Sequence, residues 1–269
     1  MPDGLHLALT TLTVARLRRS APLDRRTAGR AMTLAPLVGL GLAVTSAGLV
    51  FLLRVLHAPD LLAAVLMIAL LALLTRGLHL DGLLDVVDGL ASYRDPEGTR
   101  TVMKRADAGP LGVAALVLVL LLQTAALSSA ISQHRGTLSL CVAVMTGRLA
   151  ITAACARTPA AVPEGLGALV AQTVRTGVTS AWCVALVAAG ALALAADPDA
   201  VHPAWLRADI GAAAVLLGLL AARLVRQHVV RRVGGLTGDV LGALNEVATT
   251  VALLVLALGA TTTAAAAGG

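Results

Sequence analysis

Long apolar runs with few charges constrain the fold of this chain more than any other feature. A helix that crosses a bilayer needs about 20 mostly apolar residues, and several runs in the 269-residue sequence approach or exceed that length. The predicted spans cover about 31–53, 61–75, 110–131, 138–156, 177–196, 210–225 and 240–260. The second run is short and continues into a polar segment. We therefore expect an all-α, polytopic transmembrane helical bundle of about seven spans, forming a single integral membrane domain over residues 1–269.

The composition agrees with a membrane protein. The mean hydropathy is +0.87 and only 13% of the residues are charged, whereas about a quarter are charged in a typical soluble domain. A net charge of +6 is compatible with nucleic-acid binding, but most basic residues lie at the ends of apolar runs, as membrane topology requires. We expect a lipid bilayer as a partner, and no nucleic acid.

The distribution of arginine predicts the orientation in the cell (cytoplasmic) membrane. With a cytoplasmic N-terminus, the basic clusters in 16–30, 76–105, 157–175 and 223–232 all lie inside. Only Arg54, Arg135 and Arg207 then lie outside. Because cytoplasmic loops are enriched in Lys and Arg, the N-terminus is predicted inside and the C-terminus outside.

The two ends of the chain are expected to lie outside the spans. The apolar segment 5–17 is too short to cross a bilayer and is predicted to be an interfacial or packing helix. The low-complexity tail 261–269 is predicted to be disordered.

The polar segment 75–112 holds six of the 15 acidic residues and is predicted to form the active-site segment at the cytoplasmic face. If 80–91 is helical, Asp81, Asp85 and Asp88 fall within an arc of about 60°. Like charges placed in this way repel one another and need a compensating cation. Oxygen ligands without Cys or His indicate Mg²⁺ or Mn²⁺ rather than zinc.

The alternative to a metal site is a solvated acidic helix without function. The apolar neighbours and the flanking spans, however, make charges without a function costly. Gly82 and Gly89 form a bare flank beside the stripe, which either a phosphate-bearing substrate or another helix can approach closely.

Basic residues surround the stripe, as binding of a polyphosphate requires. They are Arg76, Arg94, Arg100, Lys104 and Arg105. Each is alternatively a topology determinant, but Lys104 is the only lysine in the chain and is predicted to contact the substrate. His79 is a candidate catalytic group, or alternatively caps the start of the helix.

A second acidic pair, Asp239 and Glu246, lies seven residues apart at the start of the last span. Carboxylates within a membrane are costly and usually functional. The pair is predicted to complete the metal site or to orient the substrate. The alternative is a structural partnership with Arg148 or Arg223, which lie inside spans.

These residues resemble a known family. The run Gly77-Leu78-His79-Leu80-Asp81-Gly82-Leu83-Leu84-Asp85, followed by Asp88-Gly89-Leu90, resembles the signature of the cobalamin synthase (adenosylcobinamide-GDP ribazoletransferase) family. Weaker resemblances extend through most of the chain, at residues 7–17, 36–39, 103–104, 109–112, 147–148 and 237–243. One motif departs from the family pattern: Met103-Lys104-Arg105-Ala106-Asp107 exchanges the order of the Asp and the second basic residue.

The resemblance implies a reaction and a set of roles. In this reaction α-ribazole, or its 5′-phosphate, displaces GMP from adenosylcobinamide-GDP and gives adenosylcobalamin or its phosphate, with Mg²⁺ as cofactor. Metal binding would fall to Asp81, Asp85, Asp88 and Asp107, with one of the first three or His79 as general base. The substrate-binding residues would be Lys104, Arg105, Arg76, Arg94, Arg100, Gly82, Gly89, Asp239 and Glu246. The sequence leaves open whether the chain forms a homo-oligomer.

Two rival functions deserve comparison. The segment from Asp85 to Ala91 also resembles the opening of the CDP-alcohol phosphotransferase motif, but Ser92 stands where that motif has Arg and its later Asp pair is missing. An ion-coupled transporter would place its acids near the bilayer midplane, whereas these lie at the ends of spans.

Overall fold

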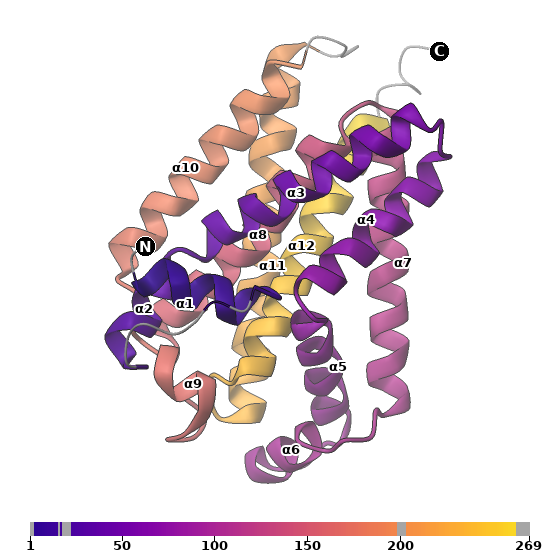
Figure 1. The fold of residues 1–269 in the computed structure, drawn as a ribbon. Helices are drawn as coiled ribbons and strands as arrows, with labels where there is room; N and C mark the ends of the chain where they lie inside the picture. Colours follow the sequence, from indigo (N-terminus) through magenta and orange to yellow (C-terminus); the bar gives the residue numbers. More distant parts are fainter. Residues whose placement is uncertain (1–2, 16, 18–22, 198–202, 262–269) are drawn as a thin grey trace.

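The computed structural model describes residues 3–15, 17, 23–197 and 203–261, and these form helices joined by short loops (Figure 1). No strand occurs in the described residues, which confirms the all-α class. The helices are α1 (Asp3–Leu12), α2 (Arg25–Thr33), α3 (Ala35–Val55), α4 (Asp60–Leu74), α5 (Leu78–Ala91), α6 (Pro96–Met103), α7 (Pro110–Ser132), α8 (Gly136–Arg157), α9 (Gly165–Val170), α10 (Thr176–Ala195), α11 (Ala204–Val233) and α12 (Gly238–Thr261). Part of the basic segment 16–30 and residues 262–269 of the predicted disordered tail lie outside the described residues.

Six helices are long and apolar enough to cross a membrane: α3, α7, α8, α10, α11 and α12. The chain is therefore a multi-pass membrane protein, as predicted. Helices α8 and α12 form the centre of the bundle, since 78% of the apolar window of each is buried. By contrast only 17% of the α10 window is buried, so this helix lies at the periphery. The central pair contains eight of the 16 buried polar or charged residues in the described part of the chain.

The second predicted span is broken into two helices. Helix α4 has only 15 residues, and α5 follows it with a bend of 88°. Arg76 and Gly77 form the bend with φ angles of 56° and 65°, in the left-handed region that side chains other than glycine rarely adopt. In Figure 1, α4 descends from the α3–α4 turn and α5 continues to the far end, where α7 begins. The bundle has seven spans if this bent pair counts as one, whereas 61–75 alone was predicted to make the second span.

The short helices α1, α2 and α9 cover the end of the bundle at which α7 begins (Figure 1). Helix α1 packs on α2 and buries Ala8 and Leu12, which confirms that the first apolar segment is a packing helix. Arg25 of α2 donates hydrogen bonds to the carbonyls of Ala168 and Ala171 at α9. The loops before α9 and α12 pair through Leu236, whose amide donates to the Pro159 carbonyl at 2.8 Å. The predicted cytoplasmic location of this end stays a prediction.

Candidate active site

Helix α5 presents the three aspartates as the spacing predicted. Residues 80–91 are helical, with Asp81 exposed and Asp85 and Asp88 half-buried. Asp239, in the first turn of α12, lies beside them, because its backbone packs against Gly82 of α5. Four carboxylates thus form one acidic cluster, consisting of Asp81, Asp85, Asp88 and Asp239.

A glycine contact between α5 and α12 brings Asp239 to this cluster. A Cβ atom on Gly82 would lie 2.7 Å from the carbonyl oxygen of Asp239, and one on Gly242 would lie 3.2 Å from Cα of Gly82. The distance at Gly82 is too short for a side chain and the one at Gly242 is tighter than an ordinary contact, so glycine at position 82 lets the two backbones pack at this separation. Of the two alternatives for the bare flank, another helix occupies it at Gly82.

Gly89 is covered in the same way, by α6. A Cβ atom there would lie 2.6 Å from Cγ of Met103, which is itself buried. A side chain at Gly82 or Gly89 would thus meet α12 or α6, and the predicted contact of these glycines with substrate stays a prediction.

Asp88 has a structural partner of its own. Its two carboxylate oxygens accept hydrogen bonds from the backbone amides of Gly109 and Gly112, each at 2.7 Å. These amides belong to the N-cap and the first turn of α7, where a carboxylate satisfies amides that have no partner within the helix. A Cβ atom on either glycine would lie 2.4 Å from an Asp88 oxygen. Asp88 therefore fixes the start of α7 against α5.

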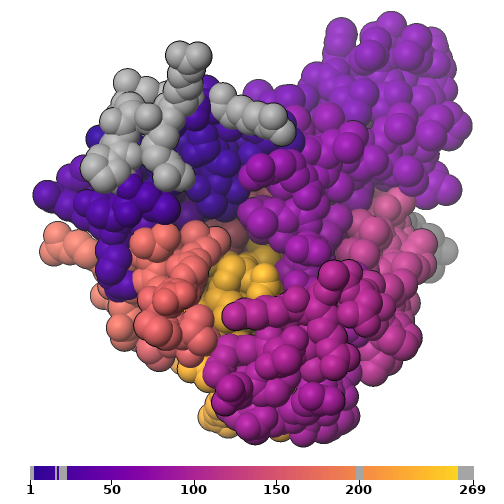
Figure 2. All heavy atoms as spheres, turned by 60° about the horizontal axis from the view of Figure 1, so that its bottom comes forward, coloured from indigo at the N-terminus to yellow at the C-terminus, as the bar shows by residue number. Residues whose placement is uncertain are grey.

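Two cavities flank the acidic cluster and contain most of the predicted charged residues. One, of about 510 Å³, is lined by Asp239, Lys104 and Arg100, and by the loops before α9 and α12. Figure 2 shows the yellow start of α12 at the base of a hollow between the coral α9 region and the magenta α5–α6 region. The other, of about 250 Å³, is lined by Asp85, Asp88, Arg105 and Asp107. Each cavity thus combines carboxylates with a basic residue.

The other three arginines that were predicted to bind substrate differ in their position relative to the two cavities. Arg100 donates a hydrogen bond of 2.6 Å from Nη1 to the Val233 carbonyl at the end of α11, so it holds α6 to α11 as well as lining the larger cavity. Arg94 is exposed and lines neither cavity, and its carbonyl accepts a hydrogen bond from Arg232. Arg76 is exposed at the α4–α5 bend. The structure does not bring Arg76 or Arg94 to either cavity.

His79 and Glu246 lie apart from the acidic cluster, inside the bundle. They are 3% and 8% exposed and line a cavity of about 30 Å³ with Arg148, Gln123 and other residues. Glu246 accepts hydrogen bonds from Gln123 Nε2 at 2.8 Å and from Asn245 Nδ2 at 3.0 Å. This placement agrees with the alternative of a structural partnership with Arg148.

This buried polar network also contains residues that the sequence analysis did not single out. Gln123 is a polar side chain in the middle of the apolar helix α7 and is 4% exposed. Asn245 precedes Glu246 and is fully buried. Because polar groups inside a span are rare and need partners, the interruption of the apolar run at Gln123 was the available signal. The interruption did not reveal that Gln123 donates a hydrogen bond to Glu246.

The acidic cluster offers carboxylate oxygens, the ligand type that Mg²⁺ takes in proteins. No group of three or more His, Cys, Asp and Glu side chains within the described parts of the chain is close enough to hold an ion unaided. Mg²⁺, however, is usually bound through one or two carboxylates, water and the phosphates of a substrate. Carboxylates that repel one another beside cavities with basic residues suit an ion that binds together with a diphosphate.

Comparison with known proteins places this arrangement in a family. A family model described as cobalamin-5-phosphate synthase matches residues 4–257. The chain belongs to this family. The match covers all the helices that form the acidic cluster and the flanking cavities.

Individual relatives agree with the family match. A protein of Frankia casuarinae named adenosylcobinamide-GDP ribazoletransferase is 46% identical over 93% of both chains. Proteins of the same name from Corynebacterium efficiens and Nocardioides sp. are 39% and 38% identical, over 90% and 94% of this chain and 86% and 98% of their own. No solved structure matches the chain.

Proposed function

We propose that this chain is an Mg²⁺-dependent adenosylcobinamide-GDP ribazoletransferase of the cell membrane, with its site at the cytoplasmic face. It would transfer the adenosylcobinamide phosphate moiety to α-ribazole or its 5′-phosphate and release GMP. The observation that carries this proposal is the acidic cluster on α5 and α12, flanked by cavities that hold Lys104 and Arg105. Relatives named for this activity match nearly the whole chain.

Binding of the donor's diphosphate would use both the carboxylates and the basic residues of the site. We assign Mg²⁺ binding to Asp81, Asp85 and Asp239, and give Asp88, whose two oxygens accept amide hydrogen bonds, the role of holding the start of α7. When bound, Mg²⁺ would neutralise charge on the diphosphate oxygens and on the GMP leaving group. Lys104 and Arg105 would neutralise the oxygens that the metal does not reach. The start of α12, at Gly238 in the larger cavity, adds the positive end of a helix dipole.

The chemical step is an in-line displacement. A ribose hydroxyl of the acceptor attacks the phosphorus on the cobinamide side, a new P–O bond forms, and the P–O bond to GMP breaks. We assign the hydroxyl proton to Asp85, a half-buried carboxylate that lines the smaller cavity together with Arg105. Asp88 would act as a positioning residue, holding the start of α7 beside the loop that contains Arg105 and Asp107.

The test is release of GMP from adenosylcobinamide-GDP by the purified protein, with α-ribazole and Mg²⁺ present. We expect one GMP for each cobalamin formed, and no turnover in Asp85→Asn or after chelation of Mg²⁺. Asp60→Asn is the matched control, because Asp60 is exposed at the other end of the bundle, at the start of α4. A transporter would release no GMP, and a CDP-alcohol phosphotransferase would produce CMP from its own donor; either result would overturn the proposal.

A further inference from the structure

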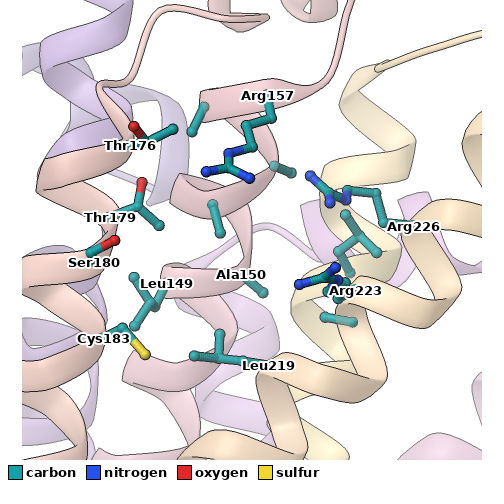
Figure 3. Close-up of a pocket in the computed structure, with 15 residues that line it drawn as sticks. Leu149, Ala150, Arg157, Thr176, Thr179, Ser180, Cys183, Leu219, Arg223 and Arg226 are labelled. Atoms are coloured by element: carbon teal, nitrogen blue, oxygen red, sulfur yellow. The ribbon is translucent and has the colours of Figure 1, made fainter.

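A further cavity, which we call the arginine cavity, lies between α8, α10 and α11 and has a volume of about 360 Å³. Arg157 of α8 and Arg223 and Arg226 of α11 extend into one end of it (Figure 3). Thr176, Thr179 and Ser180 of α10 line the facing wall, and the opposite end is apolar, with Leu149, Cys183 and Leu219. The cavity therefore has a cationic end and an apolar end.

The positive charge in the arginine cavity has no counterion within the described part of the chain. No acidic residue lines the cavity, and none of the three arginines forms a salt bridge with a described residue. Arg226 donates a hydrogen bond of 3.2 Å to Thr158 Oγ1, while the charges of Arg223 and Arg157 repel it. The Oγ1 atom of Thr179 is buried with no partner among the described residues. Guanidinium and hydroxyl donors gathered in this way suit a phosphate group.

The location of the arginine cavity separates it from the acidic cluster. It shares no lining residue with the two cavities that contain the aspartates. Its cationic end lies where α8 ends at Arg157 and α10 begins at Thr176, at one boundary of the spans. Helix α10 is peripheral, and Ser180 and Arg223 are exposed, so the cavity opens sideways toward lipid. A ligand that reaches it from this side has a charged headgroup and hydrocarbon chains.

We propose that the arginine cavity is a binding site for an anionic phospholipid. The lipid phosphate lies among Arg157, Arg223 and Arg226, and part of an acyl chain lies along Leu149 and Leu219. Basic pockets between transmembrane helices bind anionic lipid headgroups in this manner. The acyl chain explains why one end of the cavity is apolar, which a site for a soluble phosphate would not require.

The experiment measures which lipid stays with the purified full-length protein. The protein is equilibrated in micelles that contain equal amounts of phosphatidylglycerol and phosphatidylcholine, and bound lipids are counted by native mass spectrometry. We expect the wild type to prefer phosphatidylglycerol. The double variant Arg223→Gln/Arg226→Gln should lose roughly thirtyfold of that preference, since each basic residue near an anionic lipid contributes about a factor of five.

Control variants distinguish lipid binding in the arginine cavity from a general attraction between anionic lipids and positive charge on the protein. Arg231→Gln removes one positive charge, half of what the double variant loses, from an exposed position of α11 that does not line the cavity, and should keep the preference. Ser180→Glu, on the exposed wall, should lower it while leaving all arginines in place. Equal preference in the double variant and Arg231→Gln would overturn the proposal. Displacement of phosphatidylglycerol by an equal concentration of glycerol 1-phosphate would also overturn it, because the site would then bind soluble phosphates.

Discussion

Replacing Asp88 by alanine removes the acceptor of two backbone hydrogen bonds at the start of α7. The amides of Gly109 and Gly112, each 2.7 Å from an Asp88 oxygen, would lose their partner. An amide left without a partner costs about 1–3 kcal/mol when buried. Because Asp88 is only half-buried, water can reach part of the site, and we expect a total loss of about 2–4 kcal/mol.

This loss should appear as lower thermal stability. In a chain of this size each kcal/mol corresponds to about 2–4 °C, so the midpoint should fall by roughly 4–16 °C. The assay follows reaction of a maleimide dye with the buried thiol of Cys155 as the detergent-purified protein is heated. Cys141→Ser and Cys183→Ser remove the other two thiols from the background.

Asp85→Ala provides the control for this prediction. Asp85 makes no hydrogen bond with a described side chain or amide and is repelled by its acidic neighbours, so its loss should leave the midpoint unchanged or raise it. Both variants should lose activity. Asp85→Ala removes the group that accepts the hydroxyl proton, and Asp88→Ala displaces the start of α7 and the residues beside it. If Asp88→Ala unfolds at the same temperature as Asp85→Ala, the account of Asp88 as a structural anchor is wrong.

Two further predictions concern packing and donor binding. Gly82→Ala should cost about 1–3 kcal/mol of stability and most GMP release, because its methyl group would lie 2.7 Å from the Asp239 carbonyl oxygen. Gly41→Ala, whose methyl group meets open space, should change neither. Lys104→Gln should raise KM for adenosylcobinamide-GDP by at least about tenfold, the loss of one charge-assisted contact, whereas Arg94→Gln, outside both cavities, should not. Equal KM values in these two variants would contradict the role given to Lys104.

The sequence predicted features that depend on local spacing. Apolar run length identified six of the spans, and the spacing of Asp81, Asp85 and Asp88 identified a helix with one acidic face. The bend between α4 and α5 could not be predicted in this way. Its two left-handed residues are Arg76 and Gly77; glycine adopts that conformation readily, but nothing about an arginine favours it.

Other features of the site depend on partners far apart in the sequence. The glycines at 82 and 242 signal close approach, but not that they approach one another. The run from Gly109 to Gly112 likewise gives no sign that Asp88 binds its amides. His79 and Glu246 were grouped with the acidic residues because they are near them in sequence. Their burial beside Arg148 is decided by how α5, α8 and α12 pack together.

The most direct test of the central claim is the effect of Mg²⁺ on donor binding, measured without acceptor. The dissociation constant of adenosylcobinamide-GDP is determined for the purified protein in Mg²⁺ and in EDTA. If the carboxylates of the acidic cluster hold Mg²⁺ against the diphosphate, Mg²⁺ should tighten binding to the wild type and to Asp60→Asn, and should have no effect on Asp85→Asn. Equal binding to the wild type in Mg²⁺ and EDTA, or an undiminished effect of Mg²⁺ in Asp85→Asn, would contradict the account.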